Sequence, residues 1–122
     1  MRRKTTKALI ILNRNPYDST DVTWNALRLG EKLLDRGMEL RIFLMNDSVD
    51  LAREGIEPIA GYFNLSEMLA GLIRKEVPVK VCGTCLVRCG IYKGKPLIKG
   101  AIEAKMPELA EWIQECEKVI SF

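Results

Sequence analysis

Three cysteines are the residues of this chain whose type and spacing are best suited to chemistry. Cys82, Cys85 and Cys89 lie within eight residues of one another, in the pattern C-x-x-C-x-x-x-C. The chain has no histidine, which excludes the commonest general base and the Ser-His-Asp and Cys-His arrangements of nucleophilic catalysis. Chemistry in this protein must therefore depend on cysteine, carboxylate, lysine or tyrosine side chains.

Cys82 is the best candidate for a nucleophile, because it leaves the carboxyl end of a predicted strand. We expect Thr84 to cap a helical turn beside Gly83 and so to direct free backbone N–H groups toward the Cys82 sulfur. Lys80 and Arg88 add positive charge on either side. A helix N-terminus and nearby cations favour a thiolate over a thiol. A thiolate can carry a sulfane sulfur as a persulfide.

The cysteine cluster is open to four interpretations. The cysteines can be small core residues that happen to lie close together, since free cysteine is among the most buried residue types. A zinc or iron–sulfur site needs a fourth ligand. Cys116 is better explained as a core residue of the last predicted helix, so we assign no metal and no cofactor. A thioredoxin-like dithiol and thiol-based sulfur transfer remain, and the spacing alone does not separate them.

Positive charge gathers around the cysteines. The whole chain carries a net charge of +3, whereas residues 80–105 hold six basic residues against one acid, Glu103. The net charge of +3 on the whole chain is too small to indicate a nucleic-acid-binding protein. The lysines of residues 93–105 also have no aromatic stacking platform beside them. We interpret them as a solvated surface and do not expect direct binding of nucleic acid.

Length and composition predict a single domain spanning residues 1–122. The chain has 122 residues, of which 48% are hydrophobic and 29% charged, as in ordinary globular proteins. Behind the basic residues at positions 2–4, the apolar run 8–12 is shorter than a signal peptide requires. No run approaches the ~20 apolar residues of a membrane span. We expect a cytoplasmic protein without membrane contact, whose cysteines are reduced thiols.

Strands and helices are predicted to alternate along the chain. Apolar runs predict strands at residues 7–13, 39–45, 77–81 and 119–122, with a weaker one at 97–102. Helical periodicity predicts four helices. The first runs from a cap at Asp18, Ser19 or Thr20 to Gly37, the second is short and spans 47–54, and the third is capped by Asn64. The last begins at Pro107 and buries Leu109, Trp112, Ile113 and Cys116. This alternation predicts a three-layer α/β/α sandwich around a mostly parallel sheet of about five strands, of flavodoxin-like or Rossmann-like type.

In such a sheet, ligands bind outside the carboxyl ends of the strands, where the strand order reverses. This rule selects residues 13–18, the pair Asn46-Asp47, and the segment that starts at Cys82. The candidate pocket residues outside the cysteine segment are Asn15, Tyr17, Asp18 and Asp47. These residues can position a substrate or transfer a proton beside the thiolate. The simpler interpretation is that they form turns and cap helices. Trp24 is assigned to the pocket or a subunit contact, with core packing as the alternative.

Several segments match one known family. They are residues 15–18 (NPYD), 24–28 (WNALR), 43–45 (FLM) before Asp47, 61–65 (GYFNL) and, most specifically, 79–85 (VKVCGTC) followed by Gly90-Ile91. With these segments the chain resembles, from about residue 7 to residue 122, the DsrE/DsrF-like family of small sulfur-relay proteins, which includes TusD-type subunits of tRNA thiolation. The resemblance implies a DsrE-like fold, a persulfide-bearing Cys82, and assembly into trimers or hexamers. Similar sequences usually have an arginine before the glycine where this chain has Cys89.

These observations together lead to a hypothesis of sulfur relay. Cys82 accepts sulfur from a donor persulfide and passes it to a thiol of a partner, while Cys85 or Cys89 resolves the persulfide or forms a disulfide with Cys82. The partners implied are sulfur donor and acceptor proteins. The alternatives are a non-catalytic homo-oligomeric binding or structural module, and a thiol–disulfide or metal-binding protein that uses the same three cysteines.

Overall fold

The chain folds around a five-stranded sheet with the order β4-β3-β2-β1-β5, and the strand pairs are parallel. The computed structural model describes residues 5–122, so the basic positions 2–4 lie outside the described residues. The strands are β1 (Lys7–Leu12), β2 (Glu39–Leu44), β3 (Val79–Cys82), β4 (Ala101–Ala104) and β5 (Lys118–Ser121). The helices are α1 (Val22–Asp35), the 3₁₀ helix η1 (Asn46–Ala52), α2 (Leu65–Arg74), α3 (Gly83–Arg88) and α4 (Met106–Glu115).

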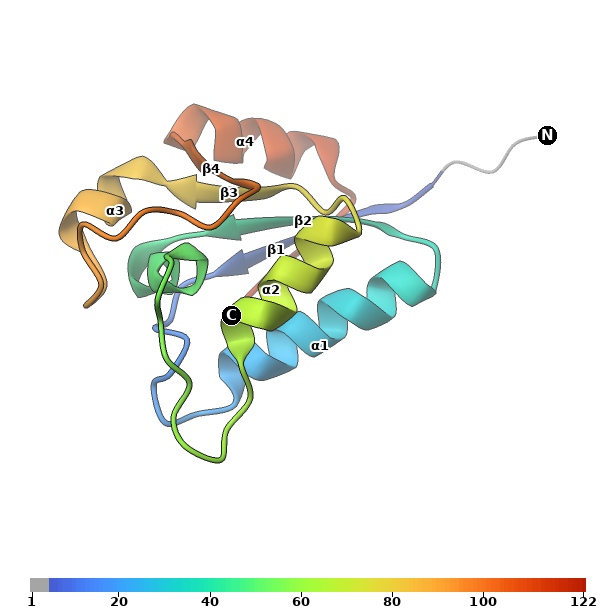
Figure 1. Ribbon diagram of the computed structural model, residues 1–122. Helices are drawn as coiled ribbons and strands as arrows, with labels where there is room; N and C mark the ends of the chain where they lie inside the picture. Colours follow the sequence, from blue (N-terminus) through green and yellow to red (C-terminus); the bar gives the residue numbers. More distant parts are fainter. Residues whose placement is uncertain (1–4) are drawn as a thin grey trace.

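Helices cover both faces of the sheet, as Figure 1 shows. α1 and α2 lie side by side on one face, and α4 lies on the other. The strands follow one direction from β1 to β4, and α4 then carries the chain back to β5 beside β1. The predicted three-layer α/β/α sandwich is confirmed. None of the helices formed by residues 5–122 combines the length and apolar character needed to cross a membrane.

The face of the sheet under α1 and α2 is built for close packing. Side chains alternate between the faces of a strand, and Ile10 of β1 and Leu40 of β2 lie on this face and are buried. Gly30 of α1 lacks a Cβ, and an added one would lie 3.0 Å from Leu40 and 3.9 Å from Leu72 of α2. The helix therefore packs closely against both the sheet and its neighbour at this glycine.

The opposite face of the sheet places two cations over one indole ring. Trp112 of α4 contacts Phe43 of β2 edge to face, with ring centroids 6.0 Å apart. Arg41 and Lys80 lie 5.5 Å and 4.7 Å from the centre of the same indole, which stabilises basic side chains on a half-covered face. Ile113, predicted on the buried face of this helix, is 43% exposed, because α4 turns only one stripe of its surface to the sheet.

The helix that follows the first strand begins later than predicted, whereas the cap of α2 is as predicted. The Asn64 side chain caps α2 by accepting a backbone N–H at 3.1 Å. The N-cap of α1 is Asp21, without a side-chain hydrogen bond. The predicted caps at 18–20 stay in the preceding loop, where the Asp18 carboxylate accepts the N–H and the hydroxyl of Thr20. Such local turns compete with capping for the same side chains.

Two short elements also differ from the prediction. The fourth strand is Ala101–Ala104 rather than residues 97–102, and Leu97 makes only an isolated bridge to Arg53. The short helix predicted at 47–54 is η1, a 3₁₀ helix. A 3₁₀ helix has about three residues per turn and therefore aligns side chains three positions apart. This geometry decides which side chains of η1 meet the neighbouring segments.

η1 holds the connection between β3 and β4 through one buried carboxylate. The Asp50 side chain is fully buried and accepts the backbone N–H groups of Ile91 and Tyr92 at 2.8 Å and 3.3 Å. Arg53, one 3₁₀ turn further on, is also buried and lies 3.4 Å from the Asp50 carboxylate. Its guanidinium donates to the carbonyl of Leu86 in α3. This ion pair therefore ties both α3 and the loop after it to η1.

Gly90 is the residue that permits this packing. Its φ is 83°, a left-handed conformation that a residue with a side chain rarely adopts. A Cβ at this position would overlap the Asp50 carboxylate. The Gly90 N–H also donates to Asp47 at 2.9 Å. The position thus requires glycine both for its backbone conformation and for its close approach to η1.

We expect Gly90→Ala to destabilise the protein more than Gly94→Ala. Both glycines have positive φ, 83° and 86°, so both substitutions carry a conformational cost of about 1–2 kcal/mol. Only Gly90 also faces Asp50, whereas Gly94 has open space around it. The free energy of unfolding, measured by urea denaturation, should fall by about 1–3 kcal/mol more for Gly90→Ala. Equal losses for the two variants would contradict the role of the Asp50 contact.

Candidate active site

Cys82 and Cys85 form a hydrogen-bonded pair at the carboxyl end of β3. Cys82 ends β3 and is itself the N-cap of α3, in place of the predicted cap at Thr84, and its sulfur accepts the Cys85 N–H at 3.3 Å. Only 7% of Cys82 and 8% of Cys85 is exposed. A hydrogen bond to a sulfur is stronger when the sulfur is charged. Cys82 therefore has a fixed backbone donor beside its sulfur.

A second backbone donor reaches the pair from η1. The N–H of Asn46 donates to the Cys85 sulfur at 3.1 Å. Asn46 has a φ of 52°, which asparagine tolerates better than most residues, and its side chain donates to Asn13 at 3.0 Å. Burial, together with the hydrogen bond to Cys82, raises the pKa of the Cys85 thiol from 9.0 to about 11. Cys85 therefore stays protonated at neutral pH.

The other two cysteines take no part in these hydrogen bonds to the two sulfurs. Cys89 is the C-cap of α3, where its N–H donates to the Cys85 carbonyl at 2.7 Å. The helical chain between Cys82 and Cys89 rises about 10 Å, beyond the Cα separation that a disulfide spans. Cys116 ends α4, and burial raises the pKa of its thiol. All four thiols are free, and within residues 5–122 no three side chains are arranged to hold a metal ion.

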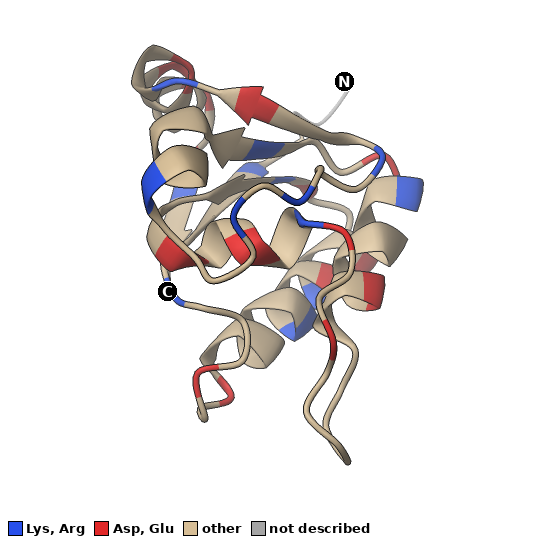
Figure 2. Cartoon of the chain, turned by 60° about the vertical axis from the view of Figure 1, so that its left-hand side comes forward, with Lys and Arg blue, Asp and Glu red and all other residues tan. Residues whose placement is uncertain are grey.

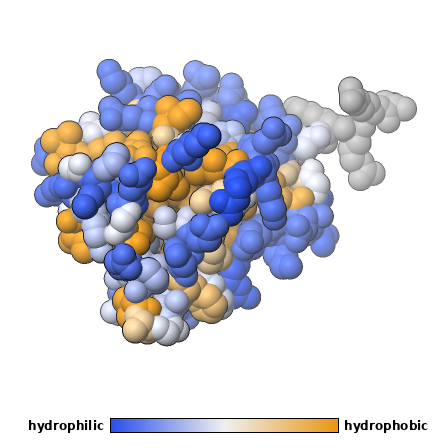
Figure 3. Space-filling model, viewed as in Figure 1, coloured by the Kyte–Doolittle hydropathy of each residue, from blue (hydrophilic) through white to orange (hydrophobic). Residues whose placement is uncertain are grey.

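An open cleft lies beside the cysteine pair. It has a volume of about 900 Å³ and is lined by α3, β4 and the start of α4. Two of the residues assigned to a pocket from the sequence, Gly83 and Thr84, are among its lining. Much of the remaining lining is apolar, including Val87 and Met106, which are 78% and 59% exposed. Figure 3 shows hydrophobic residues gathered on the side of the molecule where α3 and β4 lie.

Both signs of charge reach this cleft. Arg88 of α3 and Lys105 line it together with Glu103 of β4. Figure 2 shows basic and acidic residues interspersed over this side of the molecule. Lys80 lies earlier on the same face of β3, holds its ammonium over the indole of α4, and is not part of the lining. Positive charge on the lining of the cleft therefore comes from α3 and from the residue after β4.

Two predicted pocket residues support the scaffold of the cleft and do not line it. The Asn15 side chain donates to Asp50 at 3.3 Å and accepts the Tyr17 N–H at 2.9 Å. The Asp47 carboxylate accepts the Gly90 N–H at 2.9 Å. Neither Asn15 nor Asp47 is among the described residues that line the cleft. Both act on the position of η1 and of the segments beside it.

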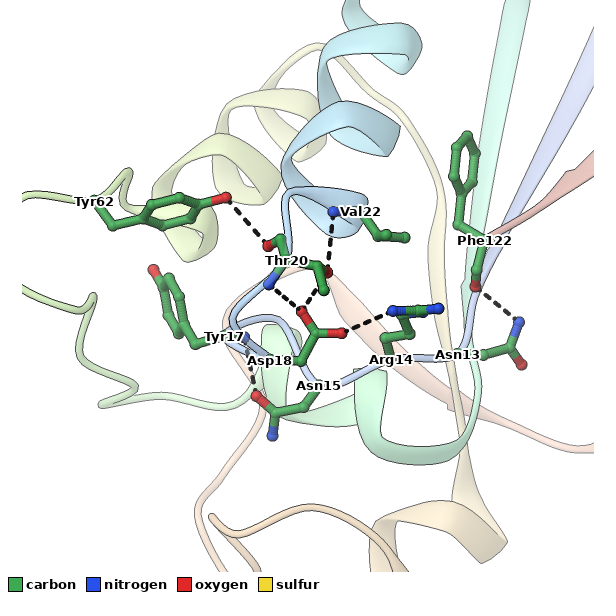
Figure 4. Close-up of polar contacts among 9 residues, drawn as sticks. All are labelled: Asn13, Arg14, Asn15, Tyr17, Asp18, Thr20, Val22, Tyr62 and Phe122. Atoms are coloured by element: carbon green, nitrogen blue, oxygen red, sulfur yellow. Dashed lines mark hydrogen bonds and ion pairs between the residues drawn. The ribbon is translucent and has the colours of Figure 1, made fainter.

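Tyr17 and Asp18 lie in the loop between β1 and α1, shown in Figure 4. The Tyr17 hydroxyl donates to the Phe63 carbonyl at 2.9 Å and accepts the first N–H of α2 at 3.0 Å. Partial burial acts to raise the pKa of Asp18, but hydrogen bonds from Thr20 and the charge of Arg14 outweigh it and lower that pKa. Tyr17 therefore fastens the start of α2, and Asp18 organises its own turn.

The order of the strands explains why these loops do not share one cleft. The strand order reverses beside β1, which pairs with both β2 and β5. Residues 13–18 therefore lie at the reversal point that the rule for parallel sheets selects. Cys82 follows β3, two strands away, which is about 10 Å across a sheet. The three loops lie at the same edge of the sheet but only the last one borders the cleft.

Trp24 packs outside the cleft, on the outer side of α1. Its indole stacks on Phe63 with ring centroids 4.4 Å apart, and Arg28 lies 4.2 Å from the indole centre. Trp24 is half-buried and joins α1 to the loop before α2. The structure thus gives Trp24 a packing role within this chain, next to a partly exposed aromatic surface.

Sequence reasoning missed Asp50 and Arg53. The available signal was a run of charged residues among apolar ones, with Asp47, Asp50 and Arg53 spaced three apart. Side chains at this spacing eclipse one another in a 3₁₀ helix, whereas in an α-helix they drift around the helix axis. Without knowledge of the helix type, Asp50 and Arg53 are interpreted as an ordinary solvent-exposed ion pair.

We expect Cys85 to react with alkylating reagents only at high pH. Because the pKa of its thiol is raised to about 11, its rate with iodoacetamide should rise about tenfold per pH unit from neutral pH up to that value. Mass spectrometry of the Cys85 peptide gives this rate, with the urea-unfolded protein as the control. A plateau near pH 9 in the folded protein would contradict the prediction.

The same shift makes stability depend on pH. Folding favours the protonated Cys85 thiol, so its contribution to stability is fully present below about pH 9 and is lost as the pH rises through about 11. This window lies well above neutral pH. Cys85 therefore imposes no loss of stability under ordinary conditions.

Comparison with known proteins places the whole described chain in one family. The profile of the DsrE/DsrF-like family matches residues 6–122. Protein YchN of Escherichia coli K12 is 39% identical over 118 residues, which cover 95% of this chain and 98% of YchN. An uncharacterized protein of Methanocaldococcus jannaschii is 33% identical over 116 residues, which cover 95% of this chain and 99% of that protein.

A solved structure agrees with the fold. The crystal structure of the Escherichia coli YchN protein aligns with a TM-score of 0.85 and 38% sequence identity, covering 97% of this chain and 100% of that one. On the match of residues 6–122 and on these relatives, the chain belongs to the DsrE/DsrF-like family.

Proposed function

We propose that this protein is a sulfur carrier that holds a sulfane sulfur as a persulfide on Cys82. The observation that carries the proposal is the position of Cys82: its sulfur accepts a backbone N–H and borders an open cleft lined by Arg88 and Lys105. These groups favour a thiolate in a place that a partner can reach. Membership of the DsrE/DsrF-like family, whose members commonly act in sulfur relay, supports the same function.

The transfer requires no net oxidation or reduction. The Cys82 thiolate attacks the outer sulfur of a donor persulfide, a new S–S bond forms, and the donor leaves as a thiolate. An acceptor thiolate then attacks the outer sulfur of the Cys82 persulfide, and the Cys82 thiolate leaves. In each step one S–S bond breaks as another forms, so the sulfane sulfur keeps its oxidation state.

The partners we propose are proteins that carry the donor persulfide and the acceptor thiol. The cleft is wide and partly apolar, with Val87 and Met106 exposed on its rim. Such a surface suits a protein segment better than a small anion. We further propose self-assembly into a trimer or hexamer, on the resemblance to this family. We also propose a cytoplasmic location, with which four free thiols agree.

The alternative function is a non-catalytic binding module of the same fold. Its support is the exposed apolar surface, where Val87 and Ile91 are each 78% exposed, since such patches mark protein contacts. In that case the cysteines only pack, and Cys82 reacts slowly with alkylating reagents at neutral pH. A sulfur carrier requires the opposite behaviour.

We expect Cys82→Ser to abolish loading of sulfane sulfur. The purified protein is incubated with a low-molecular-weight persulfide, and the modified cysteines are mapped by mass spectrometry. Wild type should gain one sulfur on Cys82, while Cys116→Ser, which removes a thiol of a different helix, should load like wild type. Equal loading of Cys82→Ser and wild type would overturn the proposed function.

We also expect the charges of the cleft to select anionic reagents. Replacing both Arg88 and Lys105 by Gln removes two positive charges from the lining. The rate of Cys82 with an anionic aromatic disulfide should then fall about tenfold, while the rate with neutral iodoacetamide changes less. Glu103→Gln is the matched variant of opposite sign and should increase the rate with the anionic reagent. Equal effects on both reagents would contradict a steering role.

A further inference from the structure

Glu103 of β4 brings a carboxylate close to Cys82. The residue after Glu103 is Ala104, which pairs with Cys82 of β3 across the sheet. The Glu103 side chain packs against Gly83, the residue that follows Cys82: a Cβ added to Gly83 would lie 3.0 Å from a Glu103 carboxylate oxygen. The carboxylate can lie there because Gly83 has no side chain. Cys82, Gly83 and Glu103 all line the cleft.

The Glu103 carboxylate has no partner of its own. In the part of the chain that the structure describes, it makes no hydrogen bond and no ion pair. Two carboxylates of the neighbouring α4 are paired by contrast. Glu108 lies 3.9 Å from the Lys80 ammonium, and Glu115 pairs with Arg41. A partner that covers the cleft removes water from the unpaired carboxylate, which costs free energy unless the partner supplies a cation.

The same charge acts on any thiol that enters the cleft. An acceptor must be a thiolate to attack the outer sulfur on Cys82, and a carboxylate near the point of attack repels an anion. A basic side chain next to the acceptor cysteine meets both conditions, because it pairs with Glu103 and favours the thiolate of its neighbour. An acidic side chain in that place adds a second repulsion.

We propose that Glu103 determines specificity, by selecting acceptor segments that carry a basic side chain next to the reactive cysteine. The proposal rests on the sulfur-carrier function proposed above and names the chemistry of its acceptor. Arg88 and Lys105, on the same lining, also make no ion pair within the described residues. The rest of the segment can therefore place acidic side chains beside them. The occupant of the cleft is a protein segment of mixed charge, with its cation at Glu103.

The experiment measures how fast short peptides release a methylthio group from Cys82. Methyl methanethiosulfonate converts Cys82 to a methyl disulfide. A peptide thiolate attacks the outer sulfur, a peptide methyl disulfide forms, and Cys82 leaves as a thiolate. Three otherwise identical peptides carry Lys, Gln or Glu directly before a single cysteine. Each rate, followed by mass spectrometry of the Cys82 peptide, is divided by the rate of the same peptide with a small methyl disulfide, which removes the effect of the peptide's own thiol pKa.

We expect the normalised rate in wild type to be about fivefold higher for the Lys peptide than for the Glu peptide. Glu103→Gln should bring this ratio to one or below, and Glu103→Lys should invert it. Glu111→Lys is the matched control. It reverses an exposed carboxylate of α4 that is not among the described residues of the lining, and it should keep the wild-type ratio.

Gly83→Ala tests the position of the carboxylate without changing its charge. The added Cβ would lie 3.0–3.2 Å from atoms of the Glu103 side chain and should displace it. The ratio should then fall between those of wild type and Glu103→Gln. A ratio equal to that of wild type would overturn the position assigned to Glu103.

Equal normalised rates for the three peptides in wild type, or equal ratios in wild type and Glu103→Lys, would overturn the selection by charge. The methyl disulfide requires no persulfide, so these rates test Glu103 even if the protein carries no sulfur. Persulfide-loaded protein should transfer its sulfane sulfur to the same peptides with the same preference. Failure of Cys82 to take up sulfane sulfur would overturn the sulfur-carrier function, while the peptide ratios would still decide the role of Glu103.

Discussion

The buried carboxylate of Asp50 is the interaction on which the geometry around the cysteines depends. It lies in a short 3₁₀ helix, faces the buried guanidinium of Arg53, and accepts two backbone N–H groups from the loop after α3. Breaking a buried ion pair leaves one charge uncompensated, at a cost of about 3–5 kcal/mol. The loop and α3 are therefore held firmly against η1, and with them the N-cap position that Cys82 occupies.

This constraint explains how a chain without histidine can surround a cysteine sulfur with fixed hydrogen-bond donors. The Cys82 sulfur accepts a backbone N–H, which does not titrate, and lies beside Cys85, whose thiol has a pKa raised to about 11. That thiol is itself fixed by the N–H of Asn46 at the start of η1. The same short helix thus sets both the loop beyond α3 and the hydrogen bonds of the cysteine pair.

The layers of the fold were predictable from local patterns, and its contacts were not. The apolar run that forms β1 and the Asn64 cap of α2 each reflect a preference of the segment itself. The fourth strand was misplaced because the residues on either side of Leu97 hydrogen-bond to Ala52 and Glu54, far away in the sequence. Among site residues, the spacing located the cysteine segment, but only packing could show that Asn15 and Tyr17 lie away from its cleft.

The sequence by itself determined the alternation of strands and helices, the family, and the placing of Cys82 at the end of a strand, since these follow from periodicity and from a local motif. Tertiary structure decided that Cys85 is the thiol that Asn46 reaches, and that Asp50 rather than Asp18 supports the site. The reason is physical. Side chains three positions apart eclipse one another in a 3₁₀ helix and are offset in an α-helix, and the helix type together with packing against α3 fixes the contacts of Asp50 and Arg53.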